Sequence, residues 1–258
     1  MTGTVSLNIS GPLARVTLSH PGKFNAMSRA MWLELRAAFI SIQQDTGIRC
    51  VLVCGEDGHF CSGGDISEYI DFRFAEQSLS DFHENEVWGG LQAMLDCDVP
   101  IVAQISGNCM GAGLEISSCC DIRIAGESAR FGAPIAKLGF PMAPREAALV
   151  IGAVGELTAR EFLLSAAVLD ASEMKLRGFL NMVVADAGLP ATTDALVSRM
   201  LALAPVAARL NKQTFRALRA HPQGLNDLAL NAYAYADSPE HREGVSAFTE
   251  KRAARFAT

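Results

Sequence analysis

Two short stretches of small residues constrain the fold of this chain most. Each lies between an apolar run and the start of a helical pattern: residues 59–66 follow the run 50–54, and residues 108–115 follow the run 101–105. Small residues at a strand-to-helix turn let a ligand approach the backbone, and free N–H groups at a helix start favour negative charge. Two such turns can aim two N–H groups at one oxygen atom. This pattern predicts an oxyanion site, with Glu115 as an acid/base carboxylate beside it.

The rest of the chain alternates strands and helices, which predicts an α/β fold of parallel strands joined by helical crossovers. The runs 5–9 and 14–18 flank Gly11 and Pro12 and predict a hairpin. Ser28 predicts the cap of a helix that ends near residue 44. Further strands are expected at residues 50–54, 101–105, 121–125, 129–131 and 182–184. Further helices are expected at residues 68–95 (with a break near Gly89 and Gly90), 114–119, 156–164, 171–177, 193–203, 206–218, 225–236 and 240–256.

Composition narrows the class of protein. The 258 residues are 50% apolar and 19% charged, which is typical of one large globular domain or one domain with an extension. The net charge of −6, without a basic cluster, argues against nucleic-acid binding. No apolar run reaches 18 residues and no signal-peptide pattern opens the chain, so we expect a cytoplasmic protein without a membrane span.

The cysteines indicate a reducing compartment. There are seven, an odd number, mostly inside apolar runs, which predicts buried free thiols rather than a disulfide framework. Cys54, His59 and Cys61 are close in sequence but have no CxxC pair beside them, so we interpret them as packing residues and expect no metal site.

Six segments, in order, resemble the crotonase family, also called the enoyl-CoA hydratase/isomerase family. They are residues 20–27, 60–66, 107–115, 120–125, 131–134 and 248–252. The resemblance implies a spiral of ββα units, with residues 1–195 as a core that holds an acyl-CoA cleft. It implies that residues 196–258 form a C-terminal helical lobe for oligomerisation, in a homotrimer or homohexamer. It also implies an acyl-CoA substrate and no separate cofactor, since CoA is part of the substrate.

The resemblance also assigns residues to roles. The two oxyanion donors fall on the backbone N–H groups of Gly64 and Ala112, where the family commonly has Gly at the second position. Glu115 matches one of the two catalytic glutamates of the family's hydratases. Tight turns and a favourable helix-start charge remain the alternative interpretations of these residues. The expected CoA-binding positions are Lys23, Ala26, Gly64, Asp65, Ile66, Ser67, Ala112 and Lys251.

One position departs from the hydratase pattern. The family's hydratases carry a second glutamate directly after the Pro of residues 131–134, where this chain has Ile135. Isoleucine cannot transfer a proton. Glu146 could replace the missing carboxylate from a shifted turn, although an ordinary helix-start glutamate is the favoured interpretation. We predict enoyl-CoA hydration with Glu115 as acid/base. The alternatives are decarboxylation, dehydration or isomerisation of an acyl-CoA, or a non-catalytic CoA-ester-binding protein.

Overall fold

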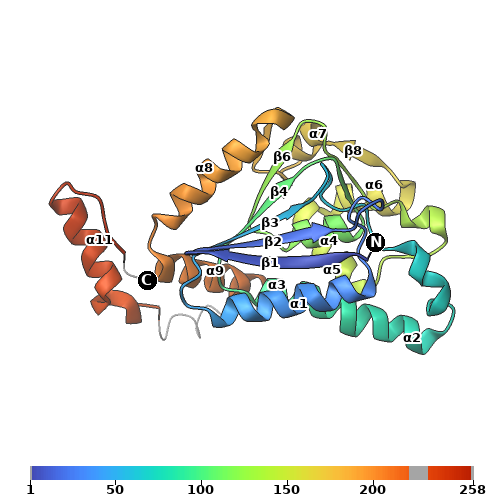
Figure 1. Cartoon of the computed structure of the whole chain (residues 1–258), viewed down its shortest axis with the longest axis horizontal. Helices are drawn as coiled ribbons and strands as arrows, with labels where there is room; N and C mark the ends of the chain where they lie inside the picture. Colours follow the sequence, from blue (N-terminus) through green and yellow to red (C-terminus); the bar gives the residue numbers. More distant parts are fainter. Residues whose placement is uncertain (1, 221–231, 257–258) are drawn as a thin grey trace.

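The framework of the molecule is a six-stranded sheet, seen edge-on as a fan in Figure 1. The computed structural model describes residues 2–220 and 232–256. The strand order is β1-β2-β3-β4-β6-β9. The bounds are Thr4–Ser10 (β1), Leu13–Ser19 (β2), Cys50–Gly55 (β3), Ile101–Ile105 (β4), Ile122–Gly126 (β6) and Met182–Val184 (β9). Only β1 and β2 pair antiparallel; the other neighbours are parallel, as the alternating pattern predicts.

A second, three-stranded sheet has the order β5-β7-β8. Its strands are Asn108–Met110 (β5), Arg130–Gly132 (β7) and Val168–Asp170 (β8). The sequence predicts β7, but residues 108–110 were expected to belong to a turn and residues 168–170 to no element. Three residues are too few to show the alternation of apolar and polar residues that identifies a strand. These strands are therefore recognised only by their pairing in the folded structure.

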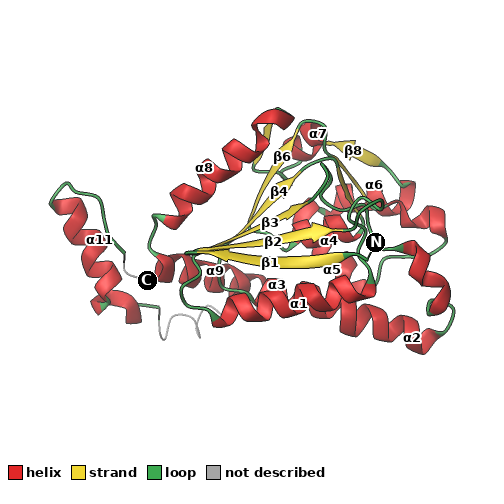
Figure 2. Cartoon of the chain, viewed as in Figure 1, coloured by secondary structure: helices red, strands yellow, loops and turns green. Residues whose placement is uncertain are grey.

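Helices surround the larger sheet (Figure 2). Their bounds are Arg29–Gln44 (α1), Glu76–Asp81 (α2), Trp88–Asp96 (α3), Ala112–Ser118 (α4), Pro144–Val154 (α5), Glu156–Ser165 (α6), Ala171–Leu176 (α7), Leu189–Leu201 (α8), Pro205–Ala220 (α9) and Pro239–Thr249 (α11). The side chain of Ser28 caps α1 by accepting a hydrogen bond from the Met31 N–H at 3.3 Å, which confirms the predicted helix start. The helix expected at residues 225–236 lies largely outside the described residues.

The segment 66–96 differs from its prediction. It consists of a 3₁₀ helix at Ile66–Asp71 (η1), then α2, a π-helical turn at Phe82–Val87 (η2) and α3. The expected break at Gly89 and Gly90 is wrong, because both residues lie inside α3. A Cβ atom at Gly90 would lie 3.1 Å from the Trp32 ring and 3.2 Å from the Trp32 carbonyl. Glycine therefore serves close packing of α3 on α1 here, rather than a helix end.

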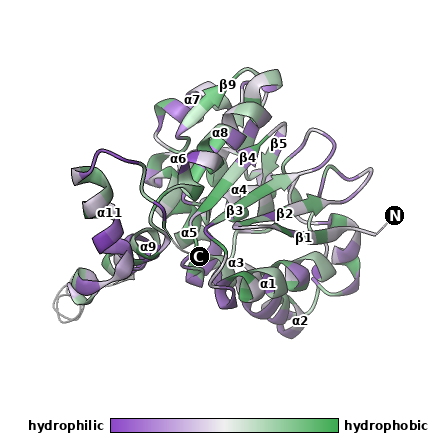
Figure 3. Cartoon of the chain, turned by 60° about the vertical axis from the view of Figure 1, so that its left-hand side comes forward, coloured by the Kyte–Doolittle hydropathy of each residue, from purple (hydrophilic) through white to green (hydrophobic). Residues whose placement is uncertain are grey.

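The core lies on both faces of the larger sheet. Along β3, Val51 and Val53 pack into the main core with α1, while Cys50 and Leu52 face Val197 of α8. Parallel strands covered on both faces are apolar along their whole length, and Figure 3 shows β3 and β4 in green at the centre. The predicted division between residues 195 and 196 falls inside α8, so it coincides with no element boundary and stays a prediction.

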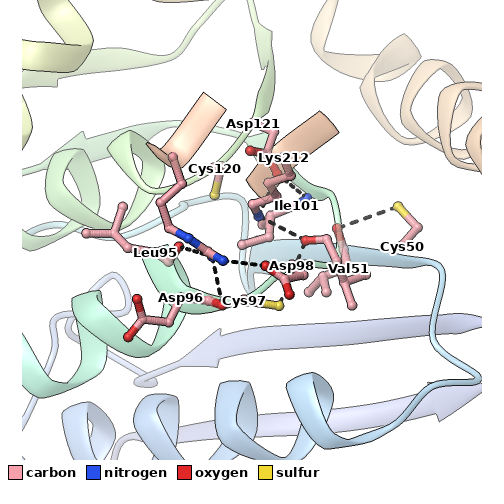
Figure 4. A network of polar contacts seen from close by, with 12 residues as sticks. Cys50, Val51, Leu95, Asp96, Cys97, Asp98, Ile101, Cys120, Asp121 and Lys212 are labelled. Carbon is pink, nitrogen blue, oxygen red and sulfur yellow. Dashed lines mark hydrogen bonds and ion pairs between the residues drawn. The ribbon is translucent and has the colours of Figure 1, made fainter. Parts of the chain in front are cut away.

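Helix α9 is fixed to the end of the sheet by partly buried ion pairs (Figure 4). Lys212 pairs with Asp121 at 2.8 Å, and Arg216 pairs with Asp98 at 2.6 Å. Burial opposes ionisation of Asp98, but hydrogen bonds from Gln213, Gln43 and Arg216 outweigh it and lower the pKa of Asp98. Helix α9 is thus anchored to the core.

All seven cysteines are buried and free, as the sequence predicts. Among the described helices, none combines the length and the apolar character needed to cross a membrane.

Candidate active site

The two small-residue turns lie against each other, as predicted. The Met110 N–H donates to the Cys61 carbonyl at 2.9 Å, and the Cys61 N–H donates to the Asn108 carbonyl at 2.8 Å. These bonds join the loop that follows β3 to the strand β5 that precedes α4. The larger and the smaller sheet therefore meet where the two turns meet.

The backbone at this junction needs glycine. Gly111 has φ of +48°, and a Cβ atom there would lie 3.5 Å from the Cα atom of Gly63, which itself has φ of +118°. The neighbouring residues are Gly64 and Ala112. Within the described part of the chain, neither of their N–H groups donates to a backbone carbonyl. Both N–H groups are thus available to an acceptor in the cleft.

Helix α4 packs tightly behind this junction and places Glu115. A Cβ atom at Gly113 would lie 2.6 Å from the Cys61 carbonyl oxygen, so only glycine lets α4 approach the loop this closely. Glu115 follows Ala112 by three residues and lies on the same side of the helix. It is buried, with 6% of its surface exposed. Burial raises the pKa of Glu115 well above its usual value, and the negative charge of Glu146 raises it further.

A cavity of about 290 Å³ opens in front of these groups. Gly64, Ala112 and Glu115 all line it, so the structure brings together the predicted oxyanion donors and the predicted carboxylate. Most of the remaining wall is apolar or aromatic, which suits an acyl group. This wall includes Trp32, Ile66, Phe82, Val87, Met110, Ile135, Leu138, Phe140 and Met142.

The position of the missing glutamate is part of this wall. Ile135 lies in the 3₁₀ helix Pro134–Leu138 (η3), packs against the core and faces the cavity. An apolar side chain therefore occupies the part of the cavity wall where the resemblance places the second glutamate.

A second carboxylate nevertheless lines the cavity. Glu146 lies in the first turn of α5, as the helix-start interpretation requires, but the residue is only 3% exposed. Its Oε1 atom forms a hydrogen bond with His83 Nδ1 at 2.7 Å. Both residues line the cavity that holds Glu115. An ordinary helix-start glutamate would point to solvent, so the interpretation favoured by the sequence does not describe this side chain.

Tyr69 covers one of the oxyanion positions. A Cβ atom at Gly64 would overlap the Tyr69 hydroxyl oxygen, at 2.1 Å, so Gly64 must lack a side chain. Burial raises the pKa of Tyr69 to about 12, which keeps its hydroxyl a hydrogen-bond donor at the rim of the cavity.

Three of the predicted CoA-binding residues form what we call the rim cluster: Lys23, Asp65 and Ser67. Lys23 Nζ donates to Asp65 Oδ2 at 2.7 Å and to Ser67 Oγ at 2.8 Å. Burial opposes ionisation of Asp65, but these partners outweigh it and lower the pKa of Asp65. The cluster borders the cavity because Gly64 and Ile66, which flank Asp65, line it.

The other predicted CoA-binding residues separate into two places. Ala26 is buried next to the Met27–Gly64 bridge, close to the rim cluster. Lys251 follows α11, which Figure 1 places at the opposite end of the molecule from α2, and it does not line the cavity. A role for Lys251 at a neighbouring subunit's substrate stays a prediction. Within the described residues, no three His, Cys, Asp or Glu side chains converge as a metal site requires.

Sequence reasoning missed several cavity residues, among them Tyr69, Arg73 and His83. Phe82 and Val87, from the same region of the chain, supply apolar lining. The π-helical turn η2, which sets the direction of His83, has no sequence signature of its own, so no pattern singles out this histidine.

Comparison with known proteins agrees with this geometry. The family model described as enoyl-CoA hydratase/isomerase matches residues 8–258. A 2,3-dehydroadipyl-CoA hydratase of Escherichia coli is 30% identical over 93% of this chain and 93% of its own length. A short-chain-enoyl-CoA hydratase of Clostridium acetobutylicum is 28% identical over 96% of this chain and 95% of its own length.

Solved structures confirm the predicted fold. An enoyl-CoA hydratase/carnithine racemase from Magnetospirillum magneticum superposes with a TM-score of 0.92 at 32% identity, over 100% of this chain and 96% of that protein. The mixed α/β architecture with its parallel sheet is therefore the crotonase-like fold that the six sequence segments indicate.

Proposed function

Because this chain belongs to the enoyl-CoA hydratase/isomerase family, we propose that it adds water across the double bond of a 2-enoyl-CoA thioester. One observation carries the proposal: two free backbone N–H groups and a buried carboxylate, Glu115, line one cavity with apolar walls. This is the equipment that chemistry next to a carbonyl requires.

The reaction forms an enolate. The thioester oxygen lies between the N–H groups of Gly64 and Ala112. As the oxygen of water bonds to the β-carbon, the double-bond electrons move toward the carbonyl, and negative charge develops on that oxygen. Preorganised donors at such an oxygen are worth about a hundredfold to a thousandfold in rate for each donor.

Glu115 completes the addition by giving a proton to the α-carbon, and the proton that the attacking water loses returns this carboxylate to its starting state. Its raised pKa, caused first by burial and then by the charge of Glu146, favours the protonated form that this step needs. In the reverse direction the same carboxylate removes the α-proton. The CoA carried by the substrate is the only cofactor that this chemistry involves.

Substrate binding and assembly follow the family pattern in this proposal. The rim cluster and Ala26 contact the CoA part of the substrate, and Lys251 contacts that of a neighbouring subunit. The enzyme acts as a homotrimer or homohexamer in the cytoplasm, where its seven buried thiols stay reduced.

A second candidate is supported by Ile135. An apolar side chain at this position favours a reaction that uses only one carboxylate, such as decarboxylation, or dehydration of a hydroxyacyl thioester. Isomerisation, and binding without catalysis, are further alternatives that activity measurements distinguish from hydration.

The experiment is turnover of crotonyl-CoA by the purified protein, followed as loss of the absorbance of the conjugated thioester, with Glu115→Gln beside it. We expect rapid loss in the wild type and a decrease of about 10²-fold to 10⁴-fold in the variant, with binding of CoA esters retained. Absence of turnover in a wild-type protein that binds CoA esters would refute hydration, and a wider thioester panel read by mass spectrometry would then separate the alternatives.

A further inference from the structure

We propose that Glu146, oriented by His83, takes the proton from the attacking water and so replaces the carboxylate that is absent at Ile135. This inference rests on the proposed function, and it deepens that function by assigning the second proton-transfer group. Glu146 is then a catalytic residue, and His83 is a positioning residue.

The position of Glu146 supports this role. It reaches the cavity from the first turn of α5, whereas Glu115 reaches it from the first turn of α4. The two helices pack against each other, and the charge of Glu146 acts on Glu115 strongly enough to raise its pKa. A buried carboxylate is costly unless a partner stabilises it, and a helix start supplies favourable dipoles.

His83 is that partner, and its own contacts define its tautomer. Arg73 Nη1 lies 3.4 Å from His83 Nε2, and a guanidinium can only donate, so Nε2 is the acceptor. The ring proton then resides on Nδ1 and is donated to Glu146 Oε1 at 2.7 Å. Arg73 is itself held in place, because its guanidinium stacks 3.8 Å from the Phe140 ring centroid and 4.5 Å from that of Tyr69. In this tautomer His83 thus presents its Nδ1–H donor to the Glu146 carboxyl group.

The π-helical turn η2 explains how His83 reaches the cleft. In such a turn the backbone bonds run from residue i to residue i+5, so residues five apart come close together. Phe82 and Val87, which differ by five, both line the cavity, and His83 lines it with them. A regular helix would direct these side chains to different sides. π-Helical turns occur often at functional sites, which agrees with a role for this one.

The two carboxylates then perform separate steps. As the water oxygen bonds to the β-carbon, one water proton passes to Glu146 and the electrons of the double bond form the enolate. Glu115 gives its proton to the α-carbon, the enolate collapses to the thioester, and H₂O has been added. Transfer of the proton from Glu146 to Glu115, directly or through solvent, restores the starting state.

Two measurements separate these steps. The first is hydration of crotonyl-CoA, which needs both groups. The second is deuterium uptake at the α-carbon of butyryl-CoA in D₂O, read by mass spectrometry, which needs only Glu115 and the oxyanion donors. We expect Glu115→Gln to lose both activities. We expect Glu146→Gln to lose about 10²-fold to 10⁴-fold in hydration while its α-proton exchange stays close to that of the wild type.

Retained exchange also demonstrates that Glu146→Gln is folded with an intact oxyanion site. If the wild type hydrates crotonyl-CoA and Glu146→Gln keeps the full rate, this inference is overturned while the proposed function stands. If the wild type turns over no thioester of a wider panel, both are overturned. If it catalyses another reaction of that panel, the same comparison of the two variants on that reaction decides the role of Glu146.

A double variant supplies a rescue test. Ile135→Glu in the Glu146→Gln background returns a carboxylate to the wall of the same cavity. We expect it to recover part of the lost hydration rate, whereas Ile135→Gln in that background recovers none. Equal rates in the two double variants, both still active in α-proton exchange, would count against a missing water-activating carboxylate as the cause of the loss.

The role of His83 is tested by a conservative pair. His83→Asn keeps an N–H donor close to the position of Nδ1, and His83→Leu removes it. We expect His83→Leu to lower kcat for hydration about tenfold to a hundredfold with little change in KM, because a hydrogen bond to a charged group is lost. His83→Asn should recover most of that rate. Equal activity of the two variants would refute a positioning role.

Discussion

The rim cluster and the interior of the cleft hold their carboxylates in opposite ways. At the rim, Asp65 accepts hydrogen bonds from Lys23 and Ser67, and these outweigh burial and lower its pKa. In the interior, Glu115 is buried beside Glu146, no hydrogen bond contributes to offset these two effects, and its pKa rises. A permanently ionised group suits binding, whereas a group with a raised pKa suits proton transfer near neutral pH. The rim thus suits binding and the interior suits proton transfer, although Asp65 follows the predicted donor residue Gly64 directly in the sequence.

The largest effect is expected from a substitution that removes a hydrogen-bond donor from the interior of the cleft and leaves the rim cluster unchanged. Ala112→Pro removes one oxyanion N–H at the first position of α4, where a helix tolerates proline. We expect kcat/KM for crotonyl-CoA to fall about a hundredfold to a thousandfold. Ala112→Gly keeps the N–H and should stay close to the wild type. A proline variant that is folded and fully active would show that this N–H does not act on the substrate.

A second test moves α4 itself. Gly113→Ala places a Cβ atom 2.6 Å from the Cys61 carbonyl oxygen, so helix or loop must shift. We expect a loss of about 1–3 kcal/mol in the free energy of unfolding, measured by urea denaturation, together with a lower kcat. Gly188→Ala is the control, since a Cβ atom there meets no other atom within 4 Å. Equal stability of the two variants would contradict the close packing described here.

The rim is tested by Lys23→Met. Loss of this partly exposed ion pair should raise KM for crotonyl-CoA about twofold to fivefold and leave kcat nearly unchanged. Lys175→Met, which removes a lysine that does not line the cleft, should alter neither constant. A fall in kcat with unchanged KM would assign Lys23 to the interior chemistry instead.

A further test concerns the dependence of stability on pH. Because the pKa of Glu115 is raised on folding, the folded protein keeps a proton that the unfolded chain loses, so this residue lowers stability as pH rises above about 4.5. Glu115→Gln should remove this loss of stability, which amounts to at most about 1.4 kcal/mol per pH unit. The difference in Tm between variant and wild type should therefore grow from pH 4.5 upward. Parallel curves, with the exposed Glu127→Gln as control, would contradict the raised pKa.

The oxyanion turns follow from local sequence patterns and the rim residues from the family resemblance, whereas for the second carboxylate the sequence offers Glu146 only as the less favoured interpretation. Residues 59–67 and 108–115 are local patterns, in which small residues and helix starts define the geometry themselves. Glu146 is separated from His83 by 63 positions and from Glu115 by 31, so their meeting depends on how α4, α5 and η2 pack. The same reason explains Gly90, whose role against Trp32 is a contact between two helices.

The reactivity of two buried cysteines can report how often the structure around this cleft opens. Cys61 and Cys109 lie next to the two small-residue turns. Their backbones form an isolated β-bridge, and both residues are fully shielded from solvent. Burial raises the pKa of Cys61 to about 12, so thiolate is scarce while the site is closed. Alkylation of these thiols must then await local unfolding, and its rate reports the free energy of that fluctuation. A substrate that bridges both turns should slow the modification in proportion to its binding, without any added probe.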